Sequence, residues 1–99
     1  MRREAALGLT LLLVPAAAMA QAPLAAQGCL GCHGTAGGGI TPVPGLAGRP
    51  ATELVAAMTA FRANERPATI MGRIARGYTD AEIAAIAAHF AALPAGGAR

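Results

Sequence analysis

The stretch CLGCH, residues 29–33, places two thiols three positions apart and follows them directly with an imidazole. This C-x-x-C-H spacing is typical of covalent haem attachment. Cys29 and Cys32 would form thioethers to the two vinyl groups of the porphyrin, and His33 would lie under the iron as its proximal ligand. The motif therefore predicts one covalently bound haem c, with the rest of the chain folded around it.

Two other kinds of site use a C-x-x-C pair, namely a zinc site and a thioredoxin-like dithiol. A zinc site of the common four-ligand kind needs two more Cys or His, and outside the motif the chain offers only His89. We interpret His89 as an ordinary, partly exposed helical residue. A thioredoxin-like fold needs a βαβ pattern, and no segment has the period-two alternation of a strand. Both alternatives therefore fit poorly.

The N-terminus has the pattern of a secretory signal peptide. Residues 1–3 carry two arginines, residues 5–17 are mostly apolar, and residues 18–20 form a small-x-small cleavage site. The alternative is an uncleaved anchor, but the apolar run is short for a membrane span. We therefore expect a signal peptide over residues 1–20 and one haem-binding domain over residues 21–99, exported to the periplasm and without a membrane span.

Composition favours a domain that depends on its cofactor. The predicted mature chain is short and rich in alanine, and the sequence has no Trp, two Phe and one Tyr. Small domains of this kind bury a marginal core and usually recruit a metal, disulfides or a cofactor. A flat apolar macrocycle would supply the missing core, so we expect the haem-free protein to be poorly folded.

Charge excludes some functions. The mature chain would carry six arginines and four carboxylates, with no Lys, no basic run and no aromatic interleaving, so nucleic-acid binding is not supported. Four of the arginines lie within residues 62–76. They could steer an acidic partner or pair with haem propionates, and a solvated rim without a specific role is an equally good interpretation of each.

Glycine and proline organise the first half of the domain. We expect a short helix over residues 23–30 and then a loop over residues 34–48, which has too many breakers for a regular element. A haem-ligating histidine usually donates its free ring N–H to a backbone carbonyl. Pro44 is our candidate for the carbonyl that accepts from His33, with Pro42 as the rival.

Two methionines compete for the second axial position on the iron. We expect a second helix from about Pro50 to Ala63, and Met58 lies in its apolar stripe, where core packing is the simpler role. Met71 follows the helix breaker Pro67 in a segment that we predict to be a loop or broken turn. Met71 is therefore our choice of distal ligand, giving an iron held by His33 and Met71.

The last helix has the clearest signature in the chain. Thr79 and Glu82 have the spacing of a capping box, and an apolar face follows at helical spacing until about Pro94. Tyr78, directly before the cap, could pack on the haem edge, bond a propionate or belong to the core.

Taken together, the N-terminal helix, CLGCH, the Gly/Pro loop with PGLAG, the late methionine and the C-terminal helix resemble class I cytochrome c. Residues 65–93, ERPATIMGRIARGYTDAEIAAIAAHFAAL, further resemble the haem subunit of flavocytochrome c sulfide dehydrogenase. The resemblance implies a small all-α fold with three main helices and glycine/proline-rich loops around one haem. It gives the haem roles to Cys29, Cys32, His33 and Met71, and it implies a periplasmic flavoprotein (FAD) partner that oxidises sulfide.

The chain offers no catalytic residues of its own, since no nucleophile with an adjacent base and no paired carboxylates are visible. An iron with both axial positions filled cycles between ferrous and ferric without binding substrate, so we expect single-electron transfer, most simply as the haem subunit of a sulfide dehydrogenase. A free diffusible periplasmic carrier is the main alternative. A ligand-binding haem sensor would need an open iron site, which ligation by Met71 would close.

Overall fold

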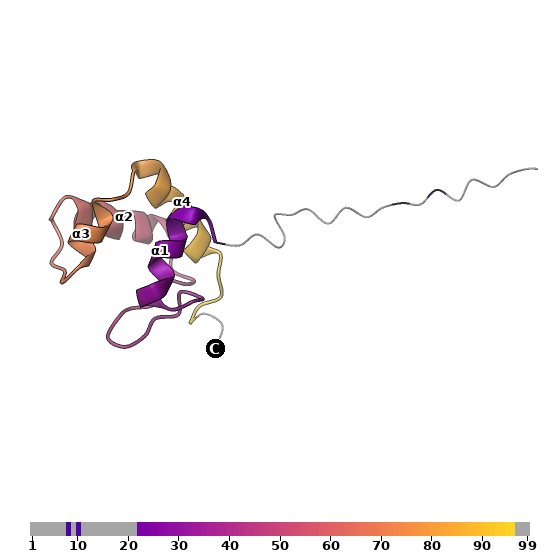
Figure 1. Ribbon diagram of the computed structural model, residues 1–99, viewed down its shortest axis with the longest axis horizontal. Helices are drawn as coiled ribbons and strands as arrows, with labels where there is room; N and C mark the ends of the chain where they lie inside the picture. Colours follow the sequence, from indigo (N-terminus) through magenta and orange to yellow (C-terminus); the bar gives the residue numbers. More distant parts are fainter. Residues whose placement is uncertain (1–7, 9, 11–21, 97–99) are drawn as a thin grey trace, which may run out of the picture.

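The computed structural model describes residues 8, 10 and 22–96, which contain four helices (Figure 1). The helices are α1 (Leu24–His33), α2 (Ala51–Arg62), α3 (Met71–Ala75) and α4 (Asp80–Ala91). The described residues form no strand, although an isolated bridge pairs Ile40 with Val43. The predicted all-α fold is confirmed, with one short helix more than the three main helices expected.

Helix α1 extends further than predicted. It begins after Pro23 and continues through the whole CLGCH motif to His33, instead of ending near Leu30. It ends at Gly34, which has φ +93°, a conformation that residues with a side chain rarely adopt. The imidazole is therefore fixed to the last turn of a helix.

Helices α2 and α4 lie where the sequence predicts them. Pro50 is the N-cap of α2, which ends at Arg62. Thr79 caps α4 through a complete capping box. The Glu82 N–H donates to the Thr79 hydroxyl, and the Thr79 N–H donates to the Glu82 carboxylate. The capping box of α4 thereby satisfies backbone donors that a helix N-terminus leaves unpaired.

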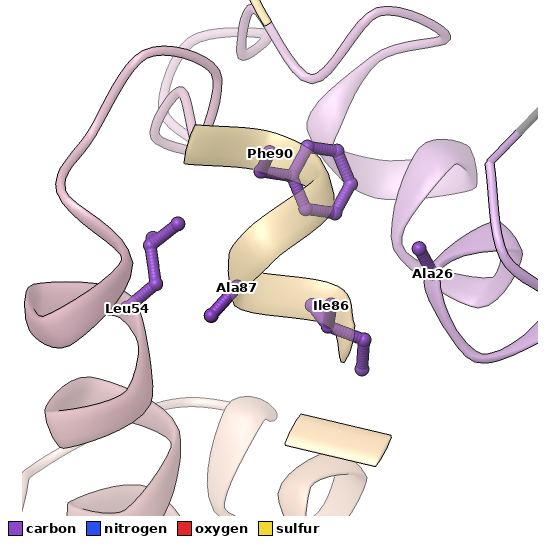
Figure 2. Close-up of a cluster of buried hydrophobic side chains, with 5 residues drawn as sticks. All are labelled: Ala26, Leu54, Ile86, Ala87 and Phe90. Atoms are coloured by element: carbon purple, nitrogen blue, oxygen red, sulfur yellow. The ribbon is translucent and has the colours of Figure 1, made fainter. Parts of the chain in front are cut away.

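Helix α4 connects α1 to the rest of the fold, because it contacts both α1 and α2. Figure 2 shows Ile86, Ala87 and Phe90 of α4 between Ala26 of α1 and Leu54 of α2. Phe90 and Ala26 are fully buried. The small side chain of Ala26 allows α1 to approach α4 closely.

Helix α3 corrects one local prediction. Met71 was expected on a loop or broken turn, whereas it is the first residue of this five-residue helix, which packs against α2. The irregular chain after α2 continues to Ile70, as Pro67 led us to expect. A single helical turn containing Gly72 is too short to produce a recognisable apolar period.

No helix in the described part of the chain is long and apolar enough to cross a membrane. The predicted signal peptide over residues 1–20 lies outside the described residues, apart from Gly8 and Thr10.

Candidate cofactor site

An apolar cavity of about 220 Å³ lies among α1, α2 and α4. Aliphatic and aromatic side chains of α2 and α4 form most of its wall, and the end of α1, the loop before α2, the chain before α3 and the first residue of α3 complete it. The α2 and α4 residues are Leu54, Ala57, Met58, Phe61, Ile83, Ile86, Ala87 and Phe90. Such a mostly apolar hollow with a few polar groups is typical of a cofactor site.

The buried His33 lines this cavity, and a hydrogen bond to a backbone carbonyl fixes the orientation of its ring. Its Nδ1 lies 2.7 Å from the carbonyl oxygen of Pro44, so the predicted contact with Pro44 rather than Pro42 is confirmed. The carbonyl can only accept, so Nδ1–H is the donor of this bond and Nε2 is the ring nitrogen left to bind a metal. An imidazole oriented in this way is a suitable axial ligand for iron.

The two cysteines stand on the same stretch of α1 but differ in exposure. Cys29 is half-buried and lines the cavity, while Cys32 is exposed and is not part of the cavity wall. Both are free thiols, and residues three apart on a helix are neighbours on its surface. Burial raises the pKa of the Cys29 thiol above its usual range. The helix therefore presents one thiol within the cavity and a second on its exposed side.

Both candidate methionines line the cavity. Met58 is buried with Ala75 and Ile83, as the core role predicted for it requires. Met71 is half-buried and packs against that cluster. The cavity thus brings two thioethers and the imidazole of His33 together, and the choice of Met71 as ligand stays a prediction.

Two arginines, Arg49 and Arg66, also line the cavity. Arg49 forms an ion pair with Glu53, and the guanidinium of Arg66 lies 4.8 Å from the centre of the Phe61 ring. Arg66 belongs to the predicted arginine-rich segment, whereas sequence reasoning did not single out Arg49. Only the position of Arg49 directly before Pro50, at the start of α2, could have drawn attention to it.

The other residues of the arginine-rich segment face elsewhere. Arg62 forms an ion pair with Asp80 and also donates to the Tyr78 carbonyl at 3.2 Å, so it ties α2 to the start of α4. Arg73 and Arg76 are exposed. Of the arginines in residues 62–76, Arg66 is therefore the one that meets the cavity.

Tyr78 and His89 lie apart from the cavity lining. Tyr78 packs against both core clusters, and its hydroxyl stands so close to Gly28 that a methyl group there would lie 2.9 Å away. Burial, followed by the charges of Cys29 and Glu82, raises the pKa of Tyr78. His89 is half-buried with its ring edge-on to Phe90, as expected of an ordinary helical residue. The core interpretation of Tyr78 fits these contacts.

The donor set fits a haem better than a bare metal ion. An imidazole and two thioethers share one apolar cavity, and one of two neighbouring thiols lines it. Within residues 22–96 no three His, Cys, Asp or Glu side chains gather to hold a metal ion. A porphyrin carries four nitrogen ligands of its own, so the protein needs to supply only the axial pair.

Four helices around one apolar cavity, with a C-x-x-C-H motif in the last turn of the first helix, define the class I cytochrome c fold. Residues 19–94 match the cytochrome c family. Among solved structures, cytochrome c4 of Acidithiobacillus ferrooxidans superposes with a TM-score of 0.64 at 35% identity, over 66% of this chain and 38% of that one.

The chain is also similar in sequence to proteins named as cytochromes or electron acceptors. The chain is 40% identical over 62 residues to the cytochrome subunit of sulfide dehydrogenase from Chlorobaculum tepidum, covering 63% of this chain and 56% of that protein. It is 41% identical to cytochrome c-554(548) of Halomonas halodenitrificans, covering 63% of this chain and 80% of that protein. It is 43% identical to a thiosulfate dehydrogenase electron acceptor of Stutzerimonas stutzeri, covering 64% and 31%.

The chain therefore belongs to the cytochrome c family, whose function is electron transfer. Family membership implies a covalently bound haem c with its iron. The chain spans only about half the length of the Chlorobaculum relative.

Proposed function

We propose that this chain is a periplasmic monohaem cytochrome c, with Cys29 and Cys32 as the thioether residues and His33 and Met71 as the axial ligands. The observation that carries this proposal is the hydrogen bond of His33 Nδ1 to the Pro44 carbonyl in a cavity that Met71 also lines. An imidazole fixed in this way offers only its Nε2 to a metal.

When bound, haem c supplies an iron that gains or loses one electron without bond chemistry. His33 would donate electron density to that iron through Nε2, and its hydrogen bond to the Pro44 carbonyl would increase the donation. As a ligand, the thioether of Met71 would favour the reduced state and raise the reduction potential. The apolar side chains of α2 and α4 exclude water from the site, so that little solvent has to reorganise during a transfer.

The physiological donor in this proposal is the flavoprotein subunit of a sulfide dehydrogenase. The similarity to the Chlorobaculum tepidum cytochrome subunit supports this assignment. Export through the signal peptide over residues 1–20 would deliver the chain to the periplasm, where haem attachment and sulfide oxidation would both take place. In such a complex the flavoprotein would carry out the chemistry on sulfide, and this chain would accept the electrons singly.

A free diffusible carrier is the second candidate, favoured by the similarity to cytochrome c-554(548) and to the thiosulfate dehydrogenase electron acceptor. It predicts a monomer that meets its partners through weak, salt-sensitive contacts. The exposed Arg73 and Arg76 would contribute to such contacts.

One purification experiment distinguishes the two candidate functions. After brief cross-linking in the cells, the protein is purified gently from its native periplasm through a C-terminal tag. Absorption spectra are recorded before and after reduction. Haem c bands together with flavin bleaching on sulfide addition support the subunit. Haem c bands with no flavin in the cross-linked material support the carrier. A Cys29→Ala/Cys32→Ala variant is the control, and absence of haem from the unaltered protein would reject both candidates.

A further inference from the structure

The loop between α1 and α2 folds back on itself so closely that two backbone segments meet at glycines. Gly39 has φ +86°, and a methyl group added to it would lie 2.6 Å from the Gly45 nitrogen and 3.0 Å from the carbonyl carbon of Pro44. A methyl group on Gly45 would lie 2.9 Å from the Gly38 carbonyl oxygen. Side chains do not fit at either position unless the backbone opposite moves.

Gly39 is also hydrogen-bonded to the backbone of His33. Its N–H donates to the carbonyl oxygen of His33 at 2.7 Å. A methyl group on Gly39 would contact the Pro44 carbonyl carbon. The oxygen of that same carbonyl accepts the hydrogen bond from His33 Nδ1. Gly39 is thus linked to the backbone of the histidine and packed against the carbonyl that orients its ring.

From this geometry we infer that Gly39 is a positioning residue for His33. The absent side chain lets the Pro44 carbonyl approach to 2.7 Å from Nδ1 and thereby sets how strongly the imidazole donates to iron. The inference deepens the proposed function, since it rests on His33 being the proximal ligand. It concerns a residue outside the attachment motif.

The chemical consequence has a definite sign. A side chain at position 39 would displace the Pro44–Gly45 peptide, and a displaced Pro44 carbonyl makes a longer or less linear hydrogen bond with Nδ1–H than the 2.7 Å bond present. The imidazole then has less anionic character and donates less electron density, because such bonds raise the basicity of a ligating histidine. Ferric iron loses more stabilisation than ferrous iron does, so the reduction potential rises.

The main test is Gly39→Ala in the haem-loaded protein. We expect hydrogen–deuterium exchange at His33 Nδ1–H, followed by NMR in the reduced state, to become at least about threefold faster. We also expect the ratio of reduced to oxidised protein at fixed poise to rise by about threefold, about 28 mV at 59 mV per tenfold for one electron.

Gly48→Ala is the matched control. Gly48 has φ +76°, and a methyl group there would lie 2.7 Å from the Ala95 Cα. An alanine at position 48 therefore causes backbone strain and crowding similar to those at Gly39, but the crowded atoms belong to the C-terminal segment and not to the Pro44 carbonyl. We expect this variant to lose stability while keeping the exchange rate and potential of the parent protein. Equal changes in both variants would overturn the inference, because general loosening would then explain them.

Gly45→Ala keeps the test decisive where Gly39→Ala fails to fold. Gly45 is not among the glycines with positive φ, so an alanine there adds the 2.9 Å contact with Gly38 without that backbone strain. If the haem-loaded Gly39→Ala and Gly45→Ala proteins keep the parent's exchange rate at His33 Nδ1–H and its reduction potential, the role of Gly39 is overturned. Absence of covalent haem from the unaltered protein, measured as the pyridine haemochrome, would instead reject the proposed function.

Discussion

Two thioethers lie at the same cavity, and their different packing gives each methionine a different expected response to substitution. Met58 is buried among Ala75 and Ile83, whereas Met71 is half-buried at the start of α3. We expect Met71→Ala to abolish the sulfur-to-iron charge-transfer band of the oxidised protein and to lower the reduction potential, because a thioether ligand favours ferrous iron. The absorption spectrum of the ferric protein measures this directly.

Met58→Ala is the control for that experiment. We expect it to keep the charge-transfer band and to lose about 2–5 kcal/mol of stability, as truncation of a buried methionine does. Disappearance of the band in Met58→Ala, with retention in Met71→Ala, would exchange the two assignments.

Arg66, one of the two arginines that line the cavity, has an effect on the potential that can be measured. Arg66 and Arg76 are both exposed, but the guanidinium of Arg66 lies over the Phe61 ring at the cavity, whereas Arg76 is outside the cavity lining. A positive charge near the iron stabilises the reduced state, so we expect Arg66→Gln to lower the reduction potential. The effect should be about 0.2–1 kcal/mol for a charge that water screens, and smaller at high salt. Redox titration checks it.

Arg76→Gln removes the same charge away from the cavity and should leave the potential close to that of the parent protein. An equal fall in both variants would show that net charge, and not the place of Arg66, determines the potential.

At the residue scale, the sequence predicts the role of a side chain when that role depends on the spacing of residues along the chain. The C-x-x-C-H motif and the proline that accepts from His33 could be identified in this way. Arg49 and Gly39 could not, because their importance depends on which parts of the folded chain lie opposite them.

At the scale of elements, the capping box of α4 makes the most direct stability prediction. Thr79→Ala removes the hydroxyl that accepts from the Glu82 N–H, so we expect a loss of about 0.5–2 kcal/mol. Urea unfolding of the haem-loaded protein, followed by circular dichroism, measures it. Thr79→Ser keeps the hydroxyl and should retain most of the stability, so similar losses in both variants would contradict a capping role.

The helices differ in how far the sequence could predict them. The starts of α2 and α4 have their own sequence signals: a proline precedes α2, and a capping box begins α4. Helix α1 continues to His33 although Gly28 and Gly31 lie within it, because contacts with α4 outweigh the low helix propensity of glycine. Helix α3 is a single turn, and its packing against α2 is a tertiary effect that no local pattern records.

For the whole molecule, the buried core is small and is divided around the cavity. One cluster joins Ala26, Leu54 and three α4 residues, and another joins Met58, Ala75 and Ile83. Several of these side chains also line the cavity, so part of their apolar surface faces the cofactor instead of protein. Such a core contributes little free energy of folding without an apolar group in the cavity.

This division of the core leads to the prediction that the haem-free protein does not fold cooperatively. A Cys29→Ala/Cys32→Ala variant cannot form either thioether, and we expect it to have reduced helicity and no cooperative thermal transition by circular dichroism. Cys32→Ala is the matched control, because Cys29, the thiol that lines the cavity, can still form one thioether. Native-like helicity and a sharp transition in the haem-free double variant would mean that contacts of α4 with α1 and α2 hold the fold by themselves, and that the cavity is preformed for its cofactor.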